Sequence, residues 1–485
     1  MKKILYILFV LTILGQYSCR KALDVNKNQN FPADVTVVQL LPAAEISIGQ
    51  VEGNYLQIVG GVWAQYWTQN PSSSQYRPLE QYQPGPSSAN TAWSELYSGA
   101  LTDLKQIVAK GGTAANTVNY TAIAKILQAY TFQVLTDNFG DIPFSEALKG
   151  EDAGITSPKY DKQEDVYNGI IALAKEGRDM INAEAGGPGA EDVIYHGNMT
   201  LWAKFANTLL LRMYLRLAYK NPGLAATGIA ELQTSAIGFI SGPSETAQIS
   251  YMSNPGNANP LYSEMVNLGY VQNLVASATA LDTLTARGDP RRSVFYSSGV
   301  GLPQGYYNIN PPGSYALPSP AVGAYANSSE SATAPVKLIS SYESLFLQSE
   351  AAARGWLAGA ADQLYVNAIT ANYTEYGLTD KESMDYLDSV YLASIAPFPS
   401  TGGTEEKAKA IITEKWIAMT GNQNDEAWIE WRRTGYPTFF TISRTSRIGN
   451  QFPQRIPYPE TEITRNLNFP GQRSMTEKVW WDAKD

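Results

Sequence analysis

The 485-residue chain contains only one cysteine, Cys19, and one histidine, His196. A single cysteine cannot form an internal disulfide, so no covalent cross-link holds the fold together. A single histidine leaves only one base for triad hydrolysis, and it rules out zinc sites built from histidine and cysteine clusters. The chain also lacks the Gly-x-x-x-x-Gly-Lys-Ser/Thr phosphate loop and the Gly-x-Ser-x-Gly nucleophile turn. Several common catalytic architectures are therefore excluded.

A membrane-length apolar run is missing from the N-terminus. The apolar stretch 4–14 has eleven residues, whereas a spanning helix needs roughly 20. It follows two lysines and precedes a small residue, Ser18, and this arrangement is typical of a secretory signal. We therefore predict a signal peptide over residues 1–18.

Cleavage after Ser18 would make Cys19 the first mature residue, the position at which bacterial lipoproteins carry acyl chains such as palmitate. Two or more chains anchor a protein stably, since each buried CH₂ contributes about 0.8 kcal/mol. Of the residues before Cys19, only Ser18 fits the usual Leu-small-small pattern, so a free thiol in an N-terminal tail is the alternative. The polar, turn-rich residues 19–35 suit a lipidated tether, and we expect residues 36–485 to form one domain.

Long basic runs are also absent. Two of the 36 basic residues lie in the leader, so the mature chain would carry 34 against 45 acidic residues, a net charge near −11. Nucleic acids are bound mainly through phosphate neutralisation, so they are not expected as partners. An acidic protein gains nothing from an anionic lipid surface either, so membrane attachment would depend on the covalent anchor.

Helical periodicity dominates the rest of the chain. In 123–135 apolar residues recur at spacings of three and four, and 201–219 is apolar on more than one side, so its two arginines would need buried partners or an exit to solvent. Residues 342–376 predict two helices joined at Gly355–Gly359, with the small and aromatic spacing of a tetratricopeptide repeat. Residues 120–150 suggest a similar helix-turn-helix. We predict a mainly α-helical scaffold of such pairs.

Acidic residues could still form a glycosidase pair, which needs two carboxylates. The candidates are Asp137 and Asp141 in one motif and Asp425, Glu426 and Glu430 in another. For the first motif, helix-end and loop chemistry is the alternative. For the second, it is ion pairing with the two arginines that follow at 432 and 433. We favour the structural alternative in both cases.

Two stretches, 68–90 and 299–329, break the helical pattern. The second contains five prolines, five glycines, four tyrosines and no charged residue, which indicates an ordered surface excursion rather than a disordered one. Tyrosine offers rigid amphipathic contact area, and asparagine offers adaptable hydrogen bonds, a combination that suits sugars. For each ring, packing of its own loop is the alternative. The candidate ligand-binding residues are Trp67, Tyr76, Tyr82, Asn257, Asn259, Tyr306, Tyr307, Tyr315 and Tyr325.

Several motifs together resemble the SusD/RagB family of outer-membrane nutrient-binding lipoproteins, in particular its SusD-like branch. They run nearly end to end through the chain. They are the Cys-x-x-x-Leu-Asp start at 19–24, WSELY at 93–97, TDNFGDIPFSEALKG at 136–150, YDKQEDVY at 160–167, DVIYHGNMTLWAKFANTLLLRM at 192–213, DPRR at 289–292, SLFLQSEAAARGW at 344–356, EKWIAMTGNQNDEAWIEWRRTGYP at 414–437 and PQRIPYPETEITRN at 453–466.

The resemblance implies a helical scaffold whose long loops form the ligand face, and a non-catalytic role. We predict no catalytic residue, metal ligand or cofactor from the residues themselves. The resemblance also implies a lipid-anchored protein at the outer membrane that passes an oligosaccharide, or in some members a peptide, to a SusC-like TonB-dependent transporter. The GDIP motif would end a helix, and EAWIEWRR would pack a C-terminal helix through Trp428 and Trp431. Two other readings stay open: a secreted glycoside hydrolase, and a structural plug or lid for a partner.

Overall fold

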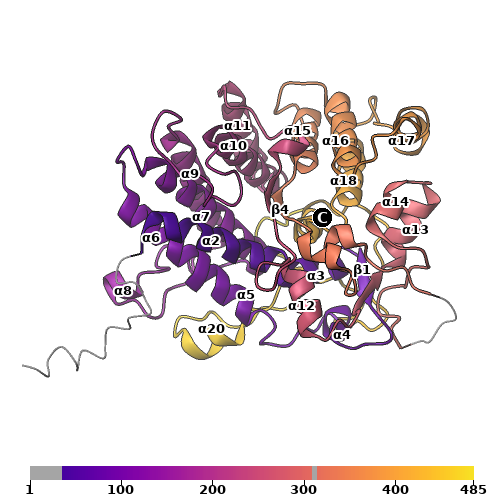
Figure 1. Cartoon of the computed structure of the whole chain (residues 1–485), viewed down its shortest axis with the longest axis horizontal. Coiled ribbons are helices and arrows are strands. Elements are labelled where there is room, and N and C mark those ends of the chain that lie inside the picture. Colours follow the sequence, from indigo (N-terminus) through magenta and orange to yellow (C-terminus); the bar gives the residue numbers. More distant parts are fainter. Residues whose placement is uncertain (1–34, 309–313, 485) are drawn as a thin grey trace, which may run out of the picture. The chain divides into compact units, whose positions relative to one another are not determined.

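The computed structural model describes residues 35–308 and 314–484 (Figure 1). The chain divides into two units, Met1–Thr36 and Val37–Asp485, and the described elements all belong to the second. The predicted signal peptide, Cys19 and nearly all of the 19–35 tether lie outside the described residues. Within the described part of the chain, every helix is too short or too polar to cross a membrane.

Helices packed in pairs form most of the second unit. Helix α7 (Val118–Phe139) lies along α9 (Gln163–Met180), and α15 (Ser341–Ala353) lies along α16 (Ala361–Glu375). A third pair joins α10 (Met199–Arg216) to α11 (Pro222–Thr234). The mainly α-helical fold class is thereby confirmed, and so are the two helices expected within 342–376.

The helix-turn-helix expected within 120–150 is wrong in its second half. Gly140 does end α7, with a φ of 87° that side chains rarely adopt. The chain then runs irregularly through the one-turn helix α8 (Gly150–Ala153), and the helix that pairs with α7 begins only at Gln163. At the start of that helix, the Asp141 carboxylate accepts a hydrogen bond from the Gln163 backbone N–H at 2.9 Å. Asp141 is therefore a helix-end residue, which was the structural alternative to a catalytic role.

The start of α10 shows why the preceding turn contains His196. The Asn198 side chain caps the helix by accepting a hydrogen bond from the Leu201 N–H at 3.2 Å. His196 lies two residues earlier in a left-handed conformation, with a φ of 51°, and is exposed. It is a turn residue, as its position in the sequence suggests.

Two small antiparallel ribbons join loops that are far apart in sequence. Strand β1 (Trp67–Gln69) pairs with β3 (Leu274–Ala276), with Trp67 opposite Ala276, and β2 (Ala247–Ile249) pairs with β4 (Val336–Ile339). The remaining elements are α2 (Val37–Glu52), α3 (Tyr55–Trp63), α4 (Arg77–Glu80), α5 (Asn90–Ser94), η1 (Glu95–Leu101), α6 (Thr102–Gly111), η2 (Pro243–Glu245), α12 (Pro260–Asn267), α13 (Ala278–Ala286), α14 (Arg291–Phe295), η3 (Pro320–Val322), η4 (Ser329–Thr333), α17 (Lys381–Tyr386), η5 (Leu387–Ile395), α18 (Thr404–Ala418), α19 (Asn424–Thr434) and α20 (Glu460–Arg465).

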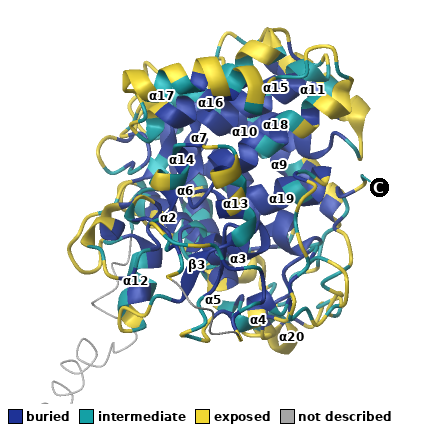
Figure 2. Ribbon diagram, turned by 90° about the vertical axis from the view of Figure 1, so that its right-hand side faces the viewer, coloured by how far each residue is buried: buried dark blue, intermediate teal, exposed yellow. Residues whose placement is uncertain are grey.

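Helix α19 packs in the interior against α3 (Figure 2). Trp428 is fully buried and meets Trp63 edge to face, with ring centroids 4.7 Å apart. A Cβ on Gly60 would come within 2.3 Å of the α19 backbone, so this crossing requires glycine. Trp431, about one turn further along α19, stacks on Phe440. The expected packing through Trp428 and Trp431 is confirmed.

Candidate ligand-binding site

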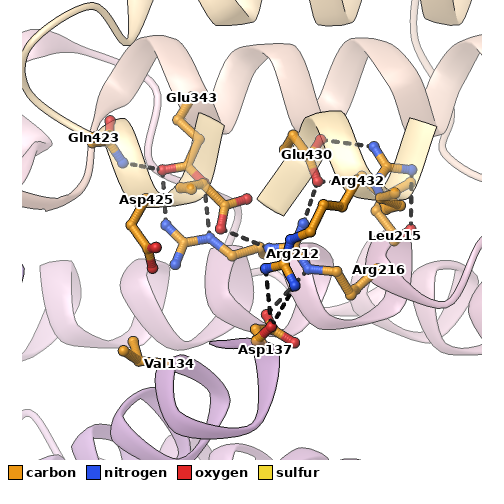
Figure 3. Close-up of polar contacts among 12 residues, drawn as sticks. Val134, Asp137, Arg212, Leu215, Arg216, Glu343, Gln423, Asp425, Glu430 and Arg432 are labelled. Atoms are coloured by element: carbon orange, nitrogen blue, oxygen red, sulfur yellow. Dashed lines mark hydrogen bonds and ion pairs between the residues drawn. The ribbon is translucent and has the colours of Figure 1, made fainter. Parts of the chain in front are cut away.

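Three of the acidic residues considered for catalysis, Asp137, Glu426 and Glu430, belong to a buried ion network between α7, α10, α15, α18 and α19 (Figure 3). Arg216 of α10 is fully buried and pairs with Asp137 at 3.2 Å, with Glu426 at 2.6 Å and with Glu430. One turn earlier, Arg212 donates two hydrogen bonds of 2.8 Å to the Glu343 carboxylate. The two arginines of the 201–219 stretch therefore have the buried partners that their positions required.

Arg433 extends the network by pairing with Glu350 and Glu430. Burial opposes ionisation, but Arg433, Lys415 and Arg216 hold the pKa of Glu430 well below its usual value. Arg432 departs from the expected pairing, because it donates to the backbone carbonyls of Asp137 and Gln454 instead of a nearby glutamate.

These acids are closed off from a polysaccharide. Asp425, Glu426 and Glu430 are at most 9% exposed, and Asp137 accepts hydrogen bonds from Tyr167, Trp481 and Arg216 in the interior. A glycosidase pair must flank the bond that it cleaves. The network is therefore structural, in line with the ion-pair alternative.

Three predicted tyrosines lie together in a region that we call the tyrosine face, formed by the half-buried Tyr306 and Tyr315 and the buried Tyr307 with Arg77, Gln81 and Arg444. The Arg444 guanidinium lies 4.1 Å from the Tyr306 ring centroid, and that of Arg77 lies 5.0 Å from the Tyr307 ring. Gln81 Nε2 donates to the Tyr307 hydroxyl at 2.9 Å. Partial burial and then the neighbouring Tyr306 raise the pKa of Tyr315.

Buried contacts fix the backbone beneath the tyrosine face. Glu80 of α4 accepts hydrogen bonds from Gly305 N–H at 2.7 Å and from Gln69 N–H at 3.1 Å. The Tyr82 hydroxyl accepts from Ser443 N–H at 3.2 Å. Three segments, at Gln69, Gly305 and Ser443, are thus held against α4 and the residues that follow it. Fixed backbone beneath the tyrosines reduces the entropy that would be lost on binding.

Five predicted residues, with Tyr82 among them, lie inside the loops or apart from this face. Trp67 is fully buried in β1. Asn259 caps α12 by accepting from two backbone N–H groups, and it donates to the Ala334 carbonyl at 2.8 Å. Asn257 is exposed in the loop before α12, and Tyr325 is half-buried. Trp67, Tyr82 and Asn259 shape the loops from within, and their direct contact with a ligand stays a prediction.

A groove of about 370 Å³ is lined by residues of α2, α3, α4, α5, η1 and α12 and of the loops beside them. The α-helices among these elements are labelled in Figure 1. Tyr76 is the one predicted ligand-binding residue in its lining. The sequence did not indicate the other lining residues, because they lie on or beside helices, where polar and aromatic residues at exposed spacings give no sign of a groove. The polar and aromatic residues of the lining include Asn54, Tyr55, Gln75, Tyr76, Glu95 and Glu264.

The groove combines rings, amides and carboxylates. The Tyr76 hydroxyl is buried and has no hydrogen-bond partner among the described residues. Burial and then the nearby Glu264 carboxylate raise the pKa of Tyr76. Burial raises the pKa of Tyr55 to about 12, and Glu95 accepts a hydrogen bond from the Ser47 hydroxyl at 2.7 Å. At neutral pH both phenols are therefore neutral donors, and hydroxyl donors of this kind can bind sugar oxygens.

A family model described as "Starch-binding associating with outer membrane" matches residues 29–459. The chain belongs to the SusD-like family. The family is one of binding proteins associated with the outer membrane, and the resemblance drawn from the sequence motifs is confirmed. No curated protein matches the sequence.

Solved structures share the SusD-like fold over nearly the whole chain. A chitin-binding protein is 24% identical, covers 93% of this chain and all of its own length, and has a TM-score of 0.77. A SusD homologue from Bacteroides uniformis is 23% identical with the same coverage and a TM-score of 0.75. A chitin-binding SusD homologue from Flavobacterium johnsoniae is 20% identical, covers 90% of this chain and 98% of its own, and has a TM-score of 0.73.

Proposed function

We propose that this SusD-like protein captures an oligosaccharide in the groove beside α4, with the tyrosine face as an adjoining contact surface, and does not cleave it. The observation that carries the proposal is the groove itself. Its volume of about 370 Å³ lies in the range of ligand pockets, roughly 300–1,000 Å³. Tyrosine rings can stack on the apolar faces of sugars, while Gln75 and Asn54 can pair with their hydroxyls.

The role in uptake extends this proposal. We expect the mature chain to be acylated at Cys19, to lie at the cell surface and to pass its ligand to a SusC-like TonB-dependent transporter. These expectations rest on the family and on the signal peptide predicted for residues 1–18. Two solved relatives are named as chitin-binding, which supports a sugar over a peptide as the ligand.

The buried Tyr76 hydroxyl gives a sharp test by calorimetry with a panel of neutral oligosaccharides. Tyr76→Phe removes only that hydroxyl, which has no partner among the described residues, so we expect weaker binding and an unchanged or slightly higher melting temperature. Tyr386→Phe is the matched control, because its hydroxyl donates to the Arg287 carbonyl at 2.6 Å in a different region. The control should lose stability and keep its affinity.

Product analysis of the same mixtures separates capture from hydrolysis. We expect the oligosaccharides to be recovered intact. Release of shorter sugars by the protein alone would establish the hydrolase reading, and binding only to peptides would shift the ligand class. An unchanged affinity in Tyr76→Phe would remove the groove from the binding site.

A further inference from the structure

The charge of the groove points to a class of ligand. We infer that the groove selects oligosaccharides that are neutral or carry free amino groups and rejects those built from uronic acids, an inference that rests on the proposed function. Glu95 and Glu264 lie in its lining on different elements, η1 and α12. Among the described residues that line the groove, none is basic.

The basic residue that adjoins the lining in sequence is directed elsewhere. Arg77 lies between Tyr76 and Pro78, which both line the groove, yet its guanidinium stacks on Tyr307 of the tyrosine face. On the Glu95 side the neighbouring ionisable group is another carboxyl rather than a cation, since burial and then Glu95 raise the pKa of Asp103. A bound uronate would therefore meet like charges without a compensating cation.

Hydrogen-bonding capacity adds to this charge preference. An ionised carboxylate only accepts hydrogen bonds, and a sugar ammonium only donates them, so Glu95 and Glu264 pair with an ammonium. The carboxylate of a uronate would face the carboxylates of the groove, so that both partners are hydrogen-bond acceptors. It would lose its bound water without gaining a donor in exchange. A neutral sugar hydroxyl can donate to either carboxylate, so neutral oligosaccharides are accepted as well.

A second, independent observation shows that this surface is built for a ligand. Tyr76 is only 7% exposed, and its hydroxyl lacks a hydrogen-bond partner among the described residues although it lies in the groove lining close to Glu264. Buried polar groups normally have partners, because an unsatisfied one lowers stability. A ligand hydroxyl or amine that enters the groove would supply the missing partner.

The experiment compares three oligosaccharides of equal length with the purified full chain at about pH 6 and low salt. They are oligomers of glucosamine, N-acetylglucosamine and galacturonic acid. We expect the first two to bind, and the galacturonic acid oligomer to bind at least tenfold more weakly than the N-acetylglucosamine oligomer. Added salt should shrink the difference, because it screens charges.

Glu264→Gln keeps the size of the side chain and removes its charge. We expect it to lower the affinity for the glucosamine oligomer by about fivefold to tenfold and to change that for the N-acetylglucosamine oligomer less than twofold. Glu382→Gln, at an exposed position on α17, is the control and should change neither.

The outcomes separate the two proposals. If the galacturonic acid oligomer binds as tightly as the neutral one, or if Glu264→Gln leaves the preference unchanged, the charge selection is overturned while oligosaccharide capture stands. If none of the three oligomers binds, the proposed function of the groove falls, and the inference falls with it.

Discussion

Carboxylates have opposite roles in two regions of this molecule. In the ion network, Asp137, Glu426 and Glu430 surround Arg216 and form ion pairs with it inside the protein. In the groove, Glu95 and Glu264 lie in a lining that contains no basic residue among those described. The difference teaches that acidic residues close together do not by themselves mark a site. A carboxylate that lines a cavity and has no cation beside it is the more informative sign of a binding site.

The largest expected effect is on the network. Arg216→Met would leave three buried carboxylates without their shared cation, and we expect the free energy of unfolding to fall by about 3–5 kcal/mol. Urea denaturation measures it. Lys381→Met, which breaks an exposed pair with Asp385, is the control and should stay within about 0.5–1 kcal/mol of the parent.

If Arg216→Met does not fold, Arg216→Lys serves instead, because it keeps the charge and loses the fork that reaches three partners. We expect an intermediate loss of stability. A stability equal to the parent in either variant would show that the network adds nothing to the fold.

The second largest effect is expected at Trp67. A surface residue that supports a ligand could be truncated at little cost to folding, but Trp67 is buried in β1, so its truncation should destabilise the fold. We expect Trp67→Ala to lower the free energy of unfolding by about 3–5 kcal/mol, because a large side chain is replaced by a cavity. A melting temperature close to the parent's would instead place Trp67 in an exposed role.

The third effect is a pH dependence from the edge of the network. Burial and then repulsion by Asp425 raise the pKa of Glu52 to about 8, and burial raises the pKa of Asp425 to about 7. The native state keeps protons that the unfolded chain loses above about pH 4. The free energy of unfolding should therefore fall as pH rises from about 5 to 8, by up to about 1.4 kcal/mol per pH unit for each retained proton.

Glu52→Gln tests this directly. Glutamine cannot ionise, and its amide oxygen can still accept the hydrogen bond that Tyr130 donates to Glu52. Stability curves between pH 5 and 8 should be flatter in the variant. Equal slopes in parent and variant would contradict the assignment. Glu430, whose pKa is lowered, acts only on the acid side, where its protonation removes stability.

The sequence predicted the scaffold better than the site, for a physical reason. A helix is specified by residues three and four apart, so 201–219 indicated both a buried helix and the need for partners at Arg212 and Arg216. The partners themselves could not be found, since Asp137 lies 79 residues from Arg216 and Glu430 lies 214 away. Gly140 indicated where α7 ends, but a residue that ends a helix does not determine the length of the loop that follows.

The groove shows the same limit. Its walls come from six helices and the loops beside them, so its concavity is a property of tertiary packing alone. The composition of 68–90 drew attention to Tyr76, whereas Tyr55 and Glu264 lie on helices and look like ordinary surface or core positions. The family motifs were informative for the fold because they record local packing, such as the Trp428 contact with α3.

The smallest effect concerns the tyrosine face. Tyr306→Ala removes a half-buried ring that contacts Arg444, at a cost to stability of about 0.5–1 kcal/mol. If this ring also supports the ligand, the affinity for a neutral oligosaccharide should fall by roughly twofold to tenfold, since such contacts contribute about 0.5–1.5 kcal/mol. Arg444→Gln is the matched control, because it removes the cation and keeps the ring. A loss of affinity in Tyr306→Ala alone would place the ring in contact with sugar, equal losses in both variants would show that the pair acts only by holding the loop, and unchanged affinity in both would confine binding to the groove.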